Sequence, residues 1–171
     1  MQTFTYPVIF RLIYKYGNIP VTIILSLYAI SLGVNLDKGL VYIIPFVVTF
    51  LVIYFLNRHY LLLYKILPYK IEADDEKMVC SEFIFYKKNV TIYFNDITSL
   101  EGGIYSGKLN GIMRIKDGAN NRIVGFYDKM IDARKLETHI LSKVKKQIYD
   151  DVVNRLGLNK TKPDEKKKSK K

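Results

Sequence analysis

Tryptophan is absent from this chain of 171 residues, and cysteine occurs once, at position 80. A single cysteine cannot form a disulfide within the chain, which excludes the disulfide-rich class of small secreted domains. The two histidines, His59 and His139, lie far apart and have no metal-ligand spacing around them. No serine, cysteine or lysine lies in a known nucleophile motif. We therefore expect no catalytic residue, no metal and no cofactor, and a protein that is not an enzyme.

Charged residues are missing from two long stretches, Ile19–Leu36 and Leu40–Leu56, which hold 18 and 17 residues. As helices they would be about 25–27 Å long, close to the ~30 Å thickness of a membrane hydrocarbon core. Neither stretch alternates with a period of two or has a polar face, as strands and soluble amphipathic helices do. We predict a transmembrane hairpin over residues 19–67, including a juxtamembrane extension, with its turn at Asp37–Gly39.

The positive charges indicate an orientation for this hairpin. Arg11 and Lys15 precede the first span, and Arg58 and Lys65 follow the second, whereas the turn holds Lys38 alone. Because cytoplasmic loops are enriched in lysine and arginine, we expect both termini in the cytoplasm and the turn outside. The chain combines a net charge of +11 with a predicted membrane anchor. It therefore favours the lipid bilayer and anionic headgroups as partners, and we expect no nucleic acid.

Residues 1–18 are rich in aromatic side chains and hold two cations one helical turn apart, Arg11 and Lys15. This composition is typical of a helix that lies in the headgroup region, with tyrosines at the boundary. A partner-binding helix is the alternative. We predict an interfacial segment that leads into the first span and ends near Gly17 and Pro20.

Residues 68–157 have the pattern of a soluble α+β domain. Short alternating or β-rich runs separated by turn residues predict an antiparallel meander from Tyr69 to Tyr127. A helix is then expected from an N-cap at Asp132 to a stop at Gly157. Its apolar face recurs every fourth residue and is widened by three more residues: Leu136, Ile140, Val144, Ile148, Val152 and Leu156, with Leu141, Tyr149 and Val153.

A glycine-rich loop lies between two of the predicted strands, at residues 102–111. Its spacing of two glycines and a lysine is close to that of a phosphate-binding loop. Such a loop requires Ser or Thr next and then a helix, whereas Leu109 follows and the next element is predicted to be a strand. We instead interpret it as a candidate partner-binding loop, whose residues are Gly102, Gly103, Tyr105, Gly107 and Lys108.

Three segments resemble the bacterial pleckstrin-homology-like domains: the strand Tyr93–Glu101, the strand Arg122–Tyr127 and the helix opening Asp132–Leu136. The resemblance implies an antiparallel sheet or barrel capped by one C-terminal amphipathic helix. It also implies a bacterial inner-membrane protein with two spans before the domain, and no catalytic residues. Phosphoinositide-binding members place basic residues between the first two strands, where this chain has Asp74–Lys77, so we do not expect headgroup binding there.

A lysine-rich tail occupies residues 158–171, where we expect disorder because there is little to bury. It holds seven lysines and only two acidic residues, Asp164 and Glu165. We interpret these lysines as candidate contacts to anionic lipid: Lys160, Lys162, Lys166, Lys167, Lys168, Lys170 and Lys171. The alternative is a solubilising extension that sets the membrane topology and binds no ligand.

These patterns together favour a membrane-anchored binding or scaffold protein whose cytoplasmic domain recognises a protein partner. The alternative is an accessory or regulatory subunit of a transporter or channel, in which the membrane spans carry the function. The spans hold no acidic or basic residue, so they indicate no ion pathway of their own. The sequence leaves the partner's identity and a homo-oligomeric state open.

Overall fold

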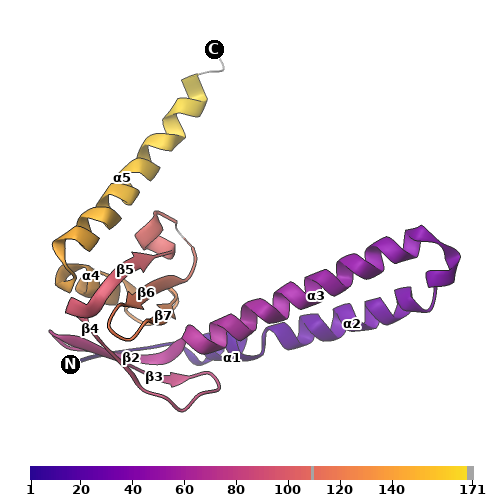
Figure 1. Cartoon of the computed structure of the whole chain (residues 1–171), viewed down its shortest axis with the longest axis horizontal. Coiled ribbons are helices and arrows are strands. Elements are labelled where there is room, and N and C mark those ends of the chain that lie inside the picture. The colour runs from indigo at the N-terminus through magenta and orange to yellow at the C-terminus, as the bar shows by residue number, and fades with distance from the viewer. Residues whose placement is uncertain (109, 169–171) are drawn as a thin grey trace. The chain divides into compact units, whose positions relative to one another are not determined.

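The computed structural model describes residues 1–108 and 110–168, and for residues 158–168 the backbone alone. The chain divides into two units (Figure 1). The hairpin unit is Val8–Lys65, and the sheet unit joins Met1–Pro7 to Ile66–Lys171. The hairpin unit is therefore inserted in the sequence of the sheet unit, between its first strand and all of its others.

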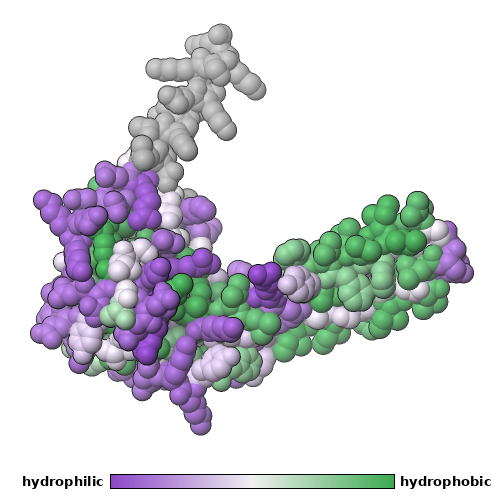
Figure 2. Space-filling model, in the orientation of Figure 1, coloured by the Kyte–Doolittle hydropathy of each residue, from purple (hydrophilic) through white to green (hydrophobic). Residues whose placement is uncertain are grey.

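The hairpin unit consists of helices α1 (Val8–Tyr16), α2 (Asn18–Gly33) and α3 (Leu40–Ile66), with a 3-10 turn at Leu36–Lys38. Two helices, Val8–Gly33 counted across Gly17 and Leu40–Ile66, are long and apolar enough to cross a membrane. Figure 2 shows the hydrophobic surface that covers α2 and α3. The two apolar helices predicted from the sequence are thus present, joined by a short turn.

A polar network joins the two long helices near the open end of the hairpin. The side-chain amide of Asn18 donates to Asn57 Oδ1 at 2.8 Å, and the amide of Asn57 donates to Thr22 Oγ1 at 3.1 Å. The Tyr64 hydroxyl lies 2.9 Å from the Lys15 carbonyl oxygen and 3.0 Å from Asn18 Oδ1. Because each group meets a partner, these polar residues connect α3 with α2 and the end of α1.

Seven strands form two antiparallel sheets in the sheet unit. The first sheet has the order β1-β2-β3-β4 and the second the order β5-β6-β7. The strands are β1 (Gln2–Thr5), β2 (Pro68–Ala73), β3 (Lys77–Phe83), β4 (Val90–Tyr93), β5 (Ile97–Glu101), β6 (Met113–Asp117) and β7 (Arg122–Phe126). The expected α+β class is confirmed. The expected barrel is not, because neither sheet closes.

Strand β1 is a correction to the sequence analysis, which placed residues 1–18 in one interfacial segment. Thr5 pairs with Lys70 and Gln2 with Ala73 along β2. Phe4 and Tyr6 are each 2% exposed, so these two aromatic residues lie in the core of the sheet unit. The Tyr6 hydroxyl also accepts a hydrogen bond from the backbone N–H of Tyr127 at 2.7 Å. A helix begins only at Val8.

The C-terminal part forms two helices, α4 (Ala133–Lys143) and α5 (Lys146–Lys168), where a single helix was expected. The chain is extended at Val144, which interrupts the helix. Helix α5 runs through Gly157, the expected stop. Asp132 precedes α4 but makes no side-chain cap, and its carboxylate pairs with Lys135 at 3.1 Å instead. Residues from 158, expected to be disordered, are described as the α5 backbone up to Lys168.

The apolar face with a four-residue period survives this interruption. Five of its members are at most 9% exposed: Leu136, Ile140, Val144, Ile148 and Val152. Tyr149 and Val153, which were expected to widen that face, are 45% and 44% exposed. The buried face is therefore narrower than predicted on α5.

We expect Val144→Asp to lower the free energy of unfolding of the sheet unit by about 3 kcal/mol or more, because it places a charge in an apolar environment. Thr138, exposed on the outer face of α4, provides the control. Thr138→Asp should change the stability by less than about 0.5 kcal/mol. Urea unfolding of the detergent-solubilised full chain measures both values, and equal losses would contradict the assigned face.

Candidate functional site

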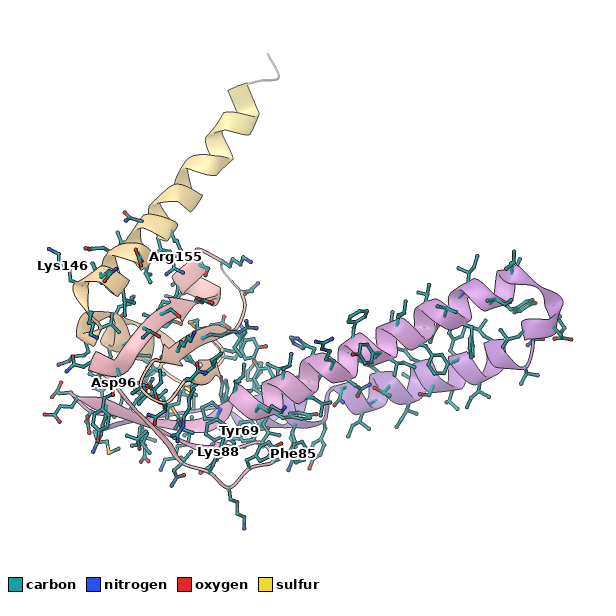
Figure 3. All side chains as sticks on the ribbon, in the orientation of Figure 1. Tyr69, Phe85, Lys88, Asp96, Lys146 and Arg155 are labelled. Atoms are coloured by element: carbon teal, nitrogen blue, oxygen red, sulfur yellow. The ribbon has the colours of Figure 1, made fainter. Side chains whose placement is uncertain are left out.

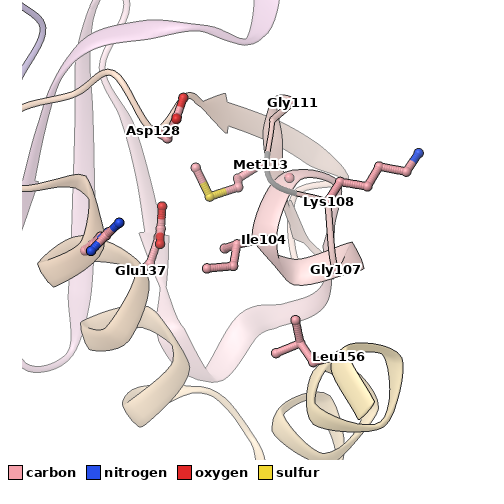
Figure 4. Close-up of a pocket in the computed structure, with 10 residues that line it drawn as sticks. Ile104, Gly107, Lys108, Gly111, Met113, Asp128, Glu137 and Leu156 are labelled. Carbon is pink, nitrogen blue, oxygen red and sulfur yellow. The ribbon is translucent and has the colours of Figure 1, made fainter. Parts of the chain in front are cut away.

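The glycine-rich loop forms one wall of a pocket of about 450 Å³ in the sheet unit (Figure 4). The other walls come from β6, α4, α5 and the segment after β7. Ten residues line it: Gly103, Ile104, Gly107, Lys108, Gly111, Met113, Asp128, Arg134, Glu137 and Leu156. Three of the five residues of the predicted partner-binding loop, Gly103, Gly107 and Lys108, are among them.

Glycine is required at two points of this loop by its backbone conformation. Gly102 has φ +75°, and a Cβ atom there would collide with the carbonyl oxygen of Ile112. Gly107 has φ +66° and ends the 3-10 turn Gly103–Ser106, with its N–H donating to the Ile104 carbonyl at 2.9 Å. Residues other than glycine rarely adopt these angles. Gly102 therefore allows the loop to approach the backbone of Ile112, just before β6, and Gly107 allows the 3-10 turn to end in a left-handed residue.

Tyr105 anchors the loop from inside. It is fully buried, so its side chain is not at the loop surface where a partner would touch it. Its hydroxyl has no hydrogen-bond partner among the described residues. Burial raises the pKa of Tyr105 well above its usual value, and the negative charge of Glu137 raises it further. Tyr105 thus positions the loop and places an unpaired hydroxyl within electrostatic reach of Glu137.

Glu137 is the least expected residue in the pocket lining. It is 6% exposed, and among the described residues no hydrogen bond or ion pair engages its carboxylate. Burial raises its pKa above the ordinary value of 4.5, the charge of Asp128 raises it further, and Arg134 opposes the shift. Figure 4 shows Glu137 and Asp128 on the same side of the pocket, and the exposed carboxylate of Asp128 pairs with Lys129 at 3.1 Å. A buried carboxyl group with a raised pKa is typical of a functional site rather than of a folding contact.

The apolar side of the pocket consists of Ile104, Met113 and Leu156. Ile104 is 45% exposed, which leaves an apolar contact surface at the mouth. Lys108 extends away from the cavity in Figure 4, so its ammonium group lies at the rim. The pocket therefore combines an apolar wall, two carboxylates and two cations, Lys108 and Arg134, which suits a ligand with both apolar and polar groups.

A more open and basic hollow of about 570 Å³ lies on the other side of the same loop. Arg114, Arg155 and Lys108 contribute three positive charges to its lining, against Glu101. Loop residues Gly102, Gly103 and Gly111 also line it. The loop thus separates a buried carboxyl group from a basic surface, so a partner at the loop would meet both charge signs.

Side chains of helix α4 contact the acidic turn Asp74–Lys77. Asp75 pairs with Lys143 at 2.8 Å, and His139 Nε2 lies 2.7 Å from the Asp74 carbonyl oxygen. The Asp74 carboxylate accepts the backbone N–H groups of Glu76 and Lys77, and these bonds lower its pKa. These contacts hold the turn in place as a structural element. Among the described residues no group of three or more His, Cys, Asp or Glu could hold a metal ion.

Sequence reasoning missed Glu137, Asp128, Arg134, Met113 and Leu156 as pocket residues. They come from four separate segments that only the fold brings together, and none forms a recognisable motif. Glu137 also lies between apolar positions of a helix, where an acidic residue is ordinarily on the solvent face. The candidate lipid contacts lie outside the described side chains, and Lys170 and Lys171 lie outside the described residues altogether.

In comparisons with protein-family models, curated proteins and solved structures, this chain matches none.

The raised pKa of Glu137 predicts a specific pH dependence of stability. Because the folded state disfavours the ionised carboxyl group, Glu137 should cost no stability below pH 4.5 and should destabilise the fold as the pH rises through its folded pKa. Glu137→Gln should remove that loss, so the variant should gain stability relative to the wild type towards neutral pH. Urea unfolding at several pH values measures the difference.

Glu101→Gln is the matched control, because Glu101 is exposed on β5 and does not line the carboxylate-containing pocket. It should leave the difference from the wild type independent of pH. A stability difference for Glu137→Gln that is constant from pH 4 to pH 8 would show that this carboxyl group is ordinarily solvated.

Proposed function

We propose that this chain is a non-enzymatic, membrane-anchored binding protein whose sheet unit recognises a protein partner in the cytoplasm. The observation that carries the proposal is the pocket beside the glycine-rich loop, with its buried, unpaired Glu137. Folding gains nothing from an ionised carboxyl group in that position. A partner that supplies a hydrogen-bond donor or a positive charge would compensate for its burial.

The exposure of the apolar helices supports the anchor. Ile24, Leu27 and Ile30 on α2 are each 64–67% exposed, and Leu51 and Phe55 on α3 are 50% and 60% exposed. The core helix of a soluble protein would bury most of these side chains. A bilayer would cover them, since each helix is long enough to cross it.

The strand pairing supports placing both termini on one side of the membrane. Thr5 pairs with Lys70, so the chain enters and leaves the hairpin unit from adjacent strands of one sheet. Two crossings then return the chain to the side from which it started. The distribution of positive charge favours the cytoplasm for that side, with the turn at Lys38 outside. The bacterial pleckstrin-homology-like resemblance, which implies this arrangement at an inner membrane, belongs to the same proposal.

The lysine-rich tail adds an electrostatic contact to this scheme. A lysine near an anionic leaflet gains about 1 kcal/mol, within a Debye length of about 8–10 Å. Seven lysines near the C-terminus, most of them after Pro163, would draw the end of the chain towards a cytoplasmic leaflet. In this scheme the tail contacts lipid, and the glycine-rich loop remains available for the protein partner.

Cysteine labelling tests the topology. The native Cys80 is fully buried, and burial raises its pKa to about 12, so it should stay unreactive. A cysteine introduced as Lys38→Cys should react with an impermeant maleimide in intact cells. Glu76→Cys, in the exposed turn of the sheet unit, should react only after permeabilisation. Labelling of Glu76→Cys from outside would overturn the proposed orientation.

Site-specific crosslinking tests the recognition surface. A photoreactive amino acid at Ile104, at the pocket mouth, should form a discrete adduct with a membrane-associated or cytoplasmic protein in intact cells. Ile123 on β7 is 46% exposed against 45% for Ile104, so it is the matched control. The Ile104 adduct should be lost with Glu137→Gln, and the Ile123 position should form none. Identical adducts from both positions, or an Ile104 adduct that survives Glu137→Gln, would contradict recognition through the pocket.

A further inference from the structure

The connection between β3 and β4, residues 84–89, is aromatic and basic, and it is exposed from Phe85 to Asn89. We call it the aromatic–lysine loop. Phe85 and Tyr86 are 59% and 48% exposed, and Lys87, Lys88 and Asn89 are exposed as well (Figure 3). The ammonium group of Lys88 lies 4.5 Å from the centre of the Phe83 ring and 5.7 Å from that of the Tyr86 ring. Two adjacent large aromatic residues at the surface of a small unit indicate a binding surface rather than a solvated turn.

The strand register places this loop at the end of the sheet from which the chain leaves for the hairpin unit. Phe83, the last residue of β3, pairs with Pro68, the first residue of β2. Pro68 comes two residues after Ile66, the last residue of α3. Thr5, the last residue of β1, pairs with Lys70 at the same end.

The path along the chain and across one strand pair from the last residue of α3 to the loop is short. Two residues span at most about 7 Å, and paired strands lie about 5 Å apart. The route from Ile66 through Pro68 and Phe83 to Phe85 is therefore at most about 20 Å long. Leu61 and Leu62, in the last turns of α3, are 59% and 54% exposed, so apolar surface continues along that helix almost to its end.

The side-chain chemistry of the loop matches a membrane interface. Aromatic rings are enriched at the level of lipid headgroups, and lysine can place its stem along apolar surface with its charge in water. The sequence from Phe83 to Asn95 holds no acidic residue, and Glu82 is the nearest one on the N-terminal side. Lys87 and Lys88 lie within this stretch, and basic side chains suit anionic headgroups.

We propose that the aromatic–lysine loop is a second membrane contact of the sheet unit, in which Phe85 and Tyr86 enter the headgroup region of the bilayer that the hairpin crosses. This inference rests on the proposed membrane anchor. It fixes the end of the sheet that faces the lipid and leaves the opposite end, with the acidic turn Asp74–Lys77, facing the cytoplasm.

The absence of tryptophan allows a direct test, since Phe85→Trp creates the sole tryptophan of the chain. The full chain is reconstituted into vesicles of phosphatidylcholine and phosphatidylglycerol with brominated acyl chains, which quench tryptophan nearby. Tyr93→Trp is the matched control, because Tyr93 is 49% exposed and pairs with Lys77 at the opposite end of the sheet. Leu51→Trp, within α3, reports the anchor itself.

We expect Phe85→Trp to emit at shorter wavelength than Tyr93→Trp and to lose emission in brominated lipid, whereas Tyr93→Trp should lose none. Adding Lys87→Glu and Lys88→Glu to Phe85→Trp should reduce that quenching. Quenching of Leu51→Trp without quenching of Phe85→Trp would overturn the loop contact while the anchor stands. Absence of quenching at Leu51→Trp would instead show that the anchor proposal is wrong. The vesicles hold no other protein, so quenching at position 85 assigns the contact to lipid.

Discussion

The pairing of β1 with β2 is the constraint on which the rest of the architecture depends. Four residues at the start of the chain, Gln2–Thr5, join a sheet whose next strand begins only at Pro68. The entropy cost of closing a loop grows slowly with its length. A short strand with buried side chains can therefore pair with β2 across the long segment that separates the two strands. Phe4 and Tyr6 provide those buried side chains. Because of this pairing, both ends of the helical hairpin emerge at one end of one sheet.

The two ends of that sheet have opposite character. At one end the chain passes to and from the apolar hairpin, and the β3–β4 connection exposes aromatic and basic side chains. At the other end the turn Asp74–Lys77 is acidic and is held by Lys143 and His139 of α4. Antiparallel pairing produces this separation, since alternate connections of a meander lie at alternate ends.

The pocket beside the glycine-rich loop is formed by a different set of constraints. The positive φ angle at Gly102 allows the loop to approach the backbone of Ile112, just before β6, and the buried Tyr105 keeps it there. Helix α4 then places Glu137 on the inner side of the same cavity. Burial raises the pKa of Glu137, and carboxyl groups with perturbed pKa values cluster at functional sites. The loop and the carboxyl group therefore form one site, although they are distant in sequence.

The sequence alone determined the features that depend on neighbours along the chain. These are the two apolar helices, the antiparallel strands, the glycine-rich loop and the row of apolar residues from Leu136 to Val152, because periodicity and turn chemistry are local. Tertiary structure decided the remainder. Residues Gln2–Thr5 form a strand only through pairing with β2, because a run of four residues is too short to predict that pairing. Tertiary structure also interrupted the C-terminal helix at Val144 and gathered Asp128 and Glu137 with Ile104, because packing and burial join residues that no local pattern relates.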